Sequence, residues 1–321
     1  MYRGRGEGRE TRMLRQATVD ETGWLRPAAG AGPREPRWGH PDGMQIGLHP
    51  LGGPRGLIRV FTPYLDHPRD RLLNFFAIEP IPAGRAERGY SELERSRLDE
   101  APGLRFWSAD DPDDPTPRAG DDPARGVVDG NTLTVGILSE PFANGADVWV
   151  TATFTRDRPH EVRVATFARE SSVPLSACIV TATMGNWARL RELELAGRAV
   201  RAAELWPDYC GSAFAPHASV GVDELLREGD EVVLRARPDE ADPAGAVYAD
   251  GTADHWHYTG RRGAQEWRAA DPDPALRGQV NGRFTYWMSE HPLPGGIAFE
   301  NVELVEPFRQ GRAFTFRVDP F

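Results

Sequence analysis

Side chains that could bind or transform a ligand are concentrated between Ala253 and Val305. This segment holds three of the eight histidines and three of the nine tryptophans of the 321-residue chain. Flat aromatic rings stack on the apolar face of a sugar ring, while imidazole, guanidinium and carboxylate groups bond to its hydroxyls. The segment therefore predicts a carbohydrate ligand without fixing a reaction. Its candidate residues are His255, Trp256, His257, Trp267, Asn281, Arg283, Trp287, His291 and Glu300.

The two histidines of the sequence HWHY are separated by a single tryptophan. On the strand that we expect here, His255 and His257 point to one face and Trp256 to the other. Paired imidazoles can bind a metal ion when a carboxylate follows closely, but the next acid is Glu266 and two arginines come before it. We therefore expect no metal ion. A catalytic or sugar-contacting histidine and a merely polar strand face both stay open.

The sequence VNGRFTYWM, residues 280–288, alternates polar and apolar side chains as a strand does. One face is predicted to be core. The other combines an indole with hydrogen-bond donors and could bind a sugar, although a solvated strand face has the same composition. The core face comprises Phe284, Tyr286 and Met288, and the ligand face comprises Asn281, Arg283, Thr285 and Trp287.

The alternation breaks in the sequence GIAFENVEL. Ile297 and Phe299 share one parity, whereas Val302 and Leu304 share the other. A β-bulge at the switch would return all four side chains to the core and re-aim a polar neighbour. Glu300 at the switch is therefore a candidate catalytic carboxylate. The alternative is an ordinary bulge with Glu300 in solvent.

Glu79 is the second candidate carboxylate. It ends an apolar run and shares parity with Phe75 and Ala77, so it could be half-buried with a raised pKa. A solvated glutamate at a strand end is the alternative. Two further histidines, His40 and His217, lie in probable loops beside aromatic residues and are candidate sugar contacts.

Composition excludes several classes of function. The net charge of −10 and the absence of a basic field argue against nucleic-acid binding. The chain contains no lysine, which excludes Schiff-base catalysis and a phosphate-loop lysine. No run of 18 apolar residues and no signal peptide occur, so we expect a soluble, cytoplasmic protein that does not bind membranes, unless the true start lies upstream.

No cofactor motif is present, and the sequence does not indicate an oligomeric state. Serine-hydrolase, zinc-protease and EF-hand motifs are missing as well. Cys178 and Cys210 are too few for a zinc site, and a disulfide between them is possible but undetermined.

About fifteen strand-like runs separated by turns predict an all-β fold, a large antiparallel two-sheet β-sandwich. Residues 1–37 are expected to be a disordered or loosely packed leader, and 38–321 one sandwich domain. The breaker-rich acidic stretch 108–126 is expected to be a loop, and Asp129-Gly130 a hairpin turn. One short helix is expected at 222–227.

These residues suggest a carbohydrate-active enzyme that cleaves a glycosidic link. A lyase would use a histidine or tyrosine base, with Arg283 neutralising a uronate. A hydrolase would use Glu79 and Glu300. The lyase is slightly favoured because histidine, tyrosine and arginine are clustered, whereas the carboxylates are scattered. A non-catalytic sugar-binding protein is the alternative, and so is a sugar epimerase or ring-opening enzyme of the mutarotase kind that uses histidine and glutamate together.

Overall fold

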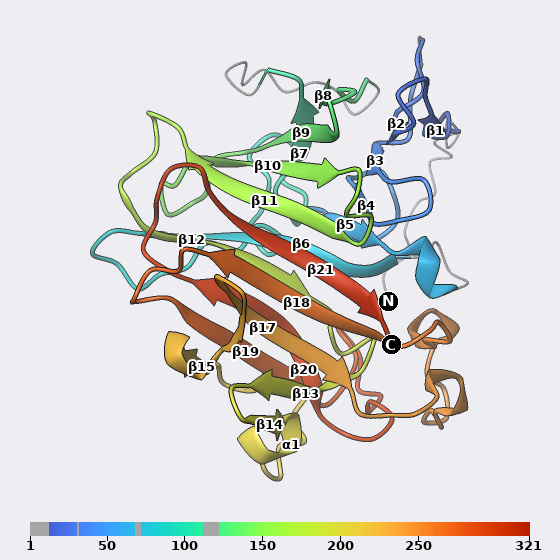
Figure 1. Cartoon of the computed structure of the whole chain (residues 1–321), viewed down its shortest axis with the longest axis vertical. Helices are drawn as coiled ribbons and strands as arrows, with labels where there is room; N and C mark the ends of the chain where they lie inside the picture. Colours follow the sequence, from blue (N-terminus) through green and yellow to red (C-terminus); the bar gives the residue numbers. More distant parts are fainter. Residues whose placement is uncertain (1–12, 31, 68–71, 112–121) are drawn as a thin grey trace, which may run out of the picture.

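Two large antiparallel sheets pack face to face in the computed structural model, which describes residues 13–30, 32–67, 72–111 and 122–321 (Figure 1). The predicted two-sheet β-sandwich is confirmed. The predicted hairpin at Asp129-Gly130 is also present, with Asp129 paired to Thr132 and Gly130 at a positive φ of 51°. The part of the acidic loop at 112–121 lies outside the described residues.

The first sheet has ten strands. In spatial order they are β1 (Thr18–Val19), β2 (Leu25–Arg26), β3 (Arg37–Gly39), β4 (Gln45–Gly47), β5 (Ile58–Phe61), β6 (Leu72–Pro82), β12 (Leu175–Thr183), β20 (Ala298–Val305), β19 (Arg277–Arg283) and β15 (Ala218–Gly221).

The second sheet has eleven strands. Along its main path these are β14 (Arg198–Arg201), β13 (Leu190–Leu195), β17 (Glu231–Pro238), β18 (Gly263–Ala270), β21 (Arg312–Pro320), β11 (Glu161–Ala168), β10 (Val148–Thr155), β9 (Thr132–Ser139) and β7 (Phe106–Ala109). Two short strands lie off this path, β16 (Leu226–Glu228) on β17 and β8 (Val127–Asp129) on β9.

Helical structure is scarce in the described residues. They contain one α-helix, α1 (Ala202–Leu205), and the single-turn 3₁₀ helices η1 (Pro63–Leu65), η2 (Val222–Glu224), η3 (Pro243–Gly245) and η4 (Asp254–Trp256). No helix in this part of the chain is long and apolar enough to cross a membrane.

The prediction of a helix at 222–227 is wrong. Val222–Glu224 forms only the turn η2, and the chain then enters β16, which pairs with β17 through Glu228 opposite Glu231. Gly229, at a positive φ of 65°, makes the tight turn between them. The backbone of this segment therefore bonds to a neighbouring strand, which leaves too few residues for a helix.

Part of the predicted leader belongs to the sandwich. β1 and β2 extend the edge of the ten-stranded sheet, and Trp24 between them is fully buried. Burial of an indole of this size strongly favours the ordered state. The expectation of a loosely packed leader is therefore wrong for the described residues 18–26.

The inward faces of the two sheets form the core. Phe76 of β6 packs against Trp267 of β18 and Phe316 of β21, with ring centroids 5.3 and 5.0 Å away. Trp267 is fully buried and donates its indole N–H to the Val302 carbonyl at 2.9 Å. The prediction that Trp267 contacts a ligand is therefore wrong, because its strand parity points it between the sheets.

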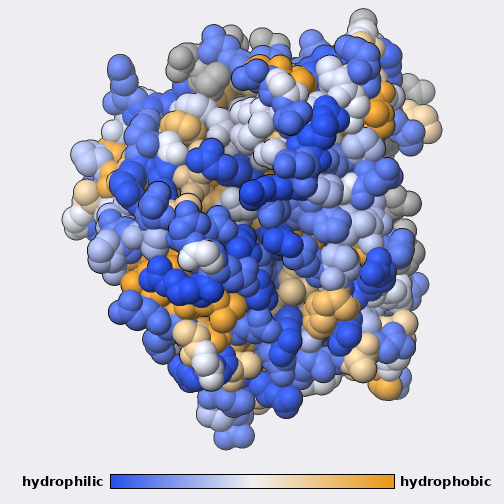
Figure 2. Space-filling model, viewed as in Figure 1, coloured by the Kyte–Doolittle hydropathy of each residue, from blue (hydrophilic) through white to orange (hydrophobic). Residues whose placement is uncertain are grey.

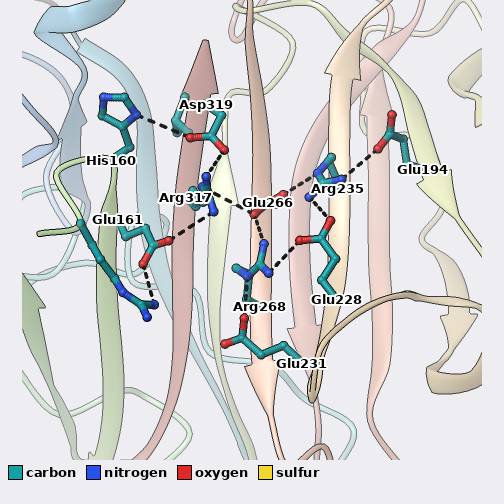
Figure 3. Close-up of polar contacts among 12 residues, drawn as sticks. His160, Glu161, Glu194, Glu228, Glu231, Arg235, Glu266, Arg268, Arg317 and Asp319 are labelled. Atoms are coloured by element: carbon teal, nitrogen blue, oxygen red, sulfur yellow. Dashed lines mark hydrogen bonds and ion pairs between the residues drawn. The ribbon is translucent and has the colours of Figure 1, made fainter. Parts of the chain in front are cut away.

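The outer face of the eleven-stranded sheet carries a lattice of arginines and carboxylates (Figure 3). At its centre, Glu266 accepts hydrogen bonds of 2.5 Å from both Arg235 and Arg268. The middle of the molecule on this side is correspondingly hydrophilic (Figure 2). These charged groups are paired with one another and hold neighbouring strands of this sheet together.

The two cysteines are not bonded to each other. Cys178 is buried and Cys210 is exposed, and both thiols are free.

Candidate functional site

An open cavity of about 760 Å³ lies on the outer face of the ten-stranded sheet. Strands β6, β19 and β20 supply its floor, and loops that follow or precede strands supply its walls. The polar or charged residues among those that line it are Arg37, Glu79, Arg88, Glu92, Thr183, His217, His255, Asn281, Glu300 and Asn301. A volume of this size is typical of a small-molecule site.

Strand alternation explains which side chains reach the floor. In β6, Phe76 and Ile78 face the core, so Phe75, Ala77 and Glu79 face outward. The predicted parity of Glu79 is therefore observed, and Glu79 does line the cavity.

A β-bulge re-aims β20 at the cavity. Val280 pairs with Val302 and Gly282 with Phe299, so Asn281 alone faces two residues, Glu300 and Asn301. Both line the cavity, while Phe299 and Val302 on either side return to the core. The bulge predicted from the broken alternation is thus present at Glu300-Asn301.

Asn281 connects the bulge to a histidine. Its side-chain oxygen accepts a hydrogen bond from the Asn301 backbone N–H at 3.2 Å, and its amide nitrogen lies 3.3 Å from His217 Nε2. The backbone N–H fixes the amide orientation, so Nε2 of His217 must be the acceptor. The neutral ring therefore carries its proton on Nδ1.

Glu300 is a buried carboxyl group that forms no salt bridge with any described residue. It is 0 % exposed, and neither side-chain oxygen has a hydrogen-bond partner in the described part of the chain. Burial raises the pKa of Glu300 to about 8, although the charge of Arg283 acts in the opposite direction. At neutral pH this carboxyl therefore holds its proton and can act as a general acid.

A second group of buried carboxylates shares one guanidinium. Arg88 donates to Glu79 at 2.6 Å and to Glu303 at 2.9 Å, and Thr181 donates to Glu303 at 2.5 Å. Burial and repulsion by Glu303 raise the pKa of Glu79 well above its ordinary value, against the pull of Arg88. Glu303 has an additional donor in Thr181.

His217 lies beside this group. Its Nε2 is 3.9 Å from Glu303 Oε1. Burial lowers the pKa of His217, an effect that the Glu303 carboxylate partly offsets. His217 is therefore neutral at pH 7, and Glu303 can stabilise the imidazolium that forms when it takes up a proton.

Aromatic rings form one wall of the cavity. Trp256 stacks on the buried Tyr286 with ring centroids 4.9 Å apart, and Trp287 lies 5.6 Å from Phe214. Trp256, Trp287 and Phe214 all line the cavity. They offer apolar surface for stacking next to the polar floor.

Five further predictions about where side chains lie are wrong. His255 lines the cavity but not from a strand, because Asp254–Trp256 is a 3₁₀ turn closed by the His257 N–H on the Asp254 carbonyl. The turn also sends His257 away from the cavity, to stack on Tyr248 with ring centroids 4.0 Å apart.

Arg283 is buried beneath the aromatic wall. Its guanidinium donates to the carbonyl oxygens of Ser212 and Thr285 at 2.7 and 3.2 Å, and its Cζ lies 5.3 Å from the Trp287 ring centroid. It holds the loops in place and does not reach the cavity.

His40 lies elsewhere in the sandwich. It bonds to the Thr155 carbonyl at 3.1 Å and packs on Trp24, so its proposed sugar contact is wrong. Met288, predicted to be core, is 88 % exposed, because β19 ends at Arg283 and the chain turns there with Met288 at a φ of +53°.

Arg88 and Glu303 were not among the site residues predicted from the sequence. Glu303 could have been found from the bulge itself, because the shifted parity after Asn301 turns it to the cavity side. Arg88 lies in a loop and carries no such signal.

No group of three or more histidine, cysteine or acidic side chains suited to a metal ion occurs in the described residues. The chain matches no protein-family model, no curated protein and no solved structure.

Proposed function

We propose that this chain is a carbohydrate-active enzyme that opens the ring of a reducing sugar and so interconverts its anomers. The observation that carries the proposal is that Asn281 lies between Glu300, a buried carboxyl group with no hydrogen-bond partner among the described residues, and the side chain of His217. Glu300 can donate a proton, and His217 can accept one. Such a pair can move two protons in one step. The aromatic wall supports a sugar as the ligand.

The proposed reaction balances within the bound sugar. When the sugar binds, its anomeric hydroxyl replaces the Asn281 amide at Nε2 of His217, and Nε2 takes the hydroxyl proton while Glu300 gives its proton to the ring oxygen. The bond between the anomeric carbon and the ring oxygen breaks, and a carbonyl group forms. Rotation of that carbonyl followed by the reverse transfers yields the other anomer.

The ion pairs of the arginines in the cavity favour ring opening over the lyase. A uronate would need a cation for its carboxylate, yet the arginines that line the described cavity are already paired. Arg37 pairs with Glu35 at 2.8 Å, and Arg88 pairs with Glu79 and Glu303. A neutral sugar fits these walls better.

Hydrolysis of a glycosidic link is a second candidate, because Glu79 and Glu300 line the same cavity. Inverting hydrolysis uses an acid and a base on opposite faces of the sugar. Glu300 of β20 and His217, which precedes β15, instead lie on the two sides of β19 on one floor, so both face the same side of a bound sugar. This difference makes ring opening the first choice.

Polarimetry tests the proposal directly. Freshly dissolved α-anomers of glucose, galactose and xylose should equilibrate faster with the protein, and Glu300→Gln and His217→Asn should each lose the acceleration. New reducing ends from oligosaccharides would support the hydrolase instead. Sugar binding without either reaction would support a binding protein, and a product absorbing near 235 nm, on the order of the band of an unsaturated uronate formed by elimination, would support the lyase.

A further inference from the structure

A second hollow of about 600 Å³ adjoins the main cavity. It lies between the loop that follows β6 and the turn between β9 and β10. The residues that line it alone are Ala86, Glu87, Glu94, Ala143 and Asn144.

The two hollows share three residues. Arg88, Tyr90 and His217 line both, so the two hollows meet at these residues. Glu300 and Asn281, by contrast, line only the main cavity. A ligand that presents its anomeric centre to Glu300 and His217 therefore has room beyond His217 for a further group.

The walls of the second hollow are polar. Glu94 is held by the backbone N–H of Ala143 at 2.7 Å, and the buried Asn144 is held by the Pro80 carbonyl at 3.0 Å. Tyr90, 37 % exposed, lines this hollow together with the imidazole of His217. Fixed carboxylate oxygens beside these rings are suited to the hydroxyls of a neutral sugar rather than to an apolar group or an anion.

We infer that the second hollow is a subsite for another sugar unit, so that the substrate is a reducing disaccharide or a longer oligosaccharide. The inference rests on the proposed function in placing the reacting unit in the main cavity. Each hollow lies within the range of about 300–1,000 Å³ typical of small-ligand sites, so together they exceed what one sugar ring would fill. The unit in the second hollow contributes binding, and the unit in the main cavity reacts.

Titration calorimetry tests the subsite without relying on activity. The probes are glucose, galactose and xylose against maltose, cellobiose and lactose. At least one disaccharide should bind ten-fold more tightly than any of the monosaccharides. Ala143→Trp, which puts an indole into the second hollow, should reduce that ratio at least ten-fold.

Ala199→Trp is the matched control, since Ala199 is exposed on β14 at the edge of the other sheet. It should keep the ratio of the unmodified protein. Equal affinities for both classes of sugar, or a ratio that Ala143→Trp leaves unchanged, would overturn the subsite.

The two proposals fail in different ways. Disaccharide-selective binding that Ala143→Trp removes, without anomer interconversion, would refute the enzyme and keep the subsite. If the protein interconverts the anomers of monosaccharides but binds disaccharides no more tightly than monosaccharides, the subsite is refuted and the proposed enzyme activity is kept. Absence of binding to every sugar of the panel would refute both.

Discussion

The side-chain oxygen of Asn281 accepts a hydrogen bond of 3.2 Å from the backbone N–H of Asn301. Asn301 is one half of the bulge, and Glu300 is the other. Bulges leave a residue unpaired in the ladder and bend the strand. Asn281 thus satisfies a backbone group that the bulge exposes, and the same side chain bonds to His217. One amide therefore positions both the proposed acid and the proposed base.

Asn281→Ala should lower kcat for anomer interconversion at least ten-fold, because Glu300 and His217 lose their common support. The unfolding free energy should fall by about 1 kcal/mol for each hydrogen bond lost. Polarimetry and urea unfolding measure the two effects. Asn131→Ala, in an exposed hairpin turn, is the control and should change neither. An unchanged kcat in Asn281→Ala would show that Asn281 does not position the pair.

The rate should depend on pH through both proposed groups. Glu300 must keep its proton, so activity should fall as pH rises through about 8. His217 must be neutral, and since burial holds its pKa below 6.5, activity should fall only at a pH below that value. The kcat/KM profile should therefore be bell-shaped. Glu300→Gln should lose about 10²-fold or more in rate, the usual contribution of a general acid. A rate that stays constant as pH rises from 6.5 to 9 would contradict the assignment of Glu300.

Sequence parity predicted the floor of the site but not its walls. The bulge at Glu300 follows from the switch of apolar parity between Phe299 and Val302, because each apolar side chain has to reach the core. At the turn around His255, by contrast, no pattern of apolar side chains that must reach the core fixes the backbone. The backbone bonds of this turn are local, and alternating polar and aromatic residues fit a turn as well as a strand.

The pairing of Arg88 with Glu303 could not have been predicted. These residues are 215 positions apart, and the contact depends on β6, β12 and β20 lying side by side. Single-strand periodicity carries no information on which strands are neighbours. Trp267 is different, because its own strand places it in the core: Glu266 and Arg268 on either side of it bond to each other on the outer face.

Glu300 should also affect stability in a pH-dependent way. Its pKa is about 8 in the folded chain against 4.5 ordinarily, so the folded state binds the proton more tightly than the unfolded state. Stability from this group is fully present below pH 4.5 and is lost as pH rises to 8, by about 1.4 kcal/mol for each pH unit.

Glu300→Gln removes this titration. Its melting temperature should therefore fall less than that of the unmodified protein between pH 5 and pH 8, as measured by calorimetry. Glu290→Gln, at an exposed position, is the control and should keep the slope of the unmodified protein. Parallel slopes for Glu300→Gln and the unmodified protein would mean that Glu300 is ionised in the folded state.

The lattice on the opposite sheet should contribute to stability and not to catalysis. Glu266 is 2 % exposed and bonds to Arg235 and Arg268, so Glu266→Gln leaves two guanidinium groups without their central carboxylate. We expect a loss of about 1.5–3 kcal/mol in unfolding free energy, the range for hydrogen bonds to charged groups. Glu224→Gln breaks an exposed pair with Arg198 and should cost less than about 1 kcal/mol. Urea unfolding measures both losses of unfolding free energy. Equal losses would show that solvent screens the lattice as fully as the exposed pair.

The folded Glu266→Gln protein should keep its kcat, because this lattice and the cavity lie on the outer faces of different sheets.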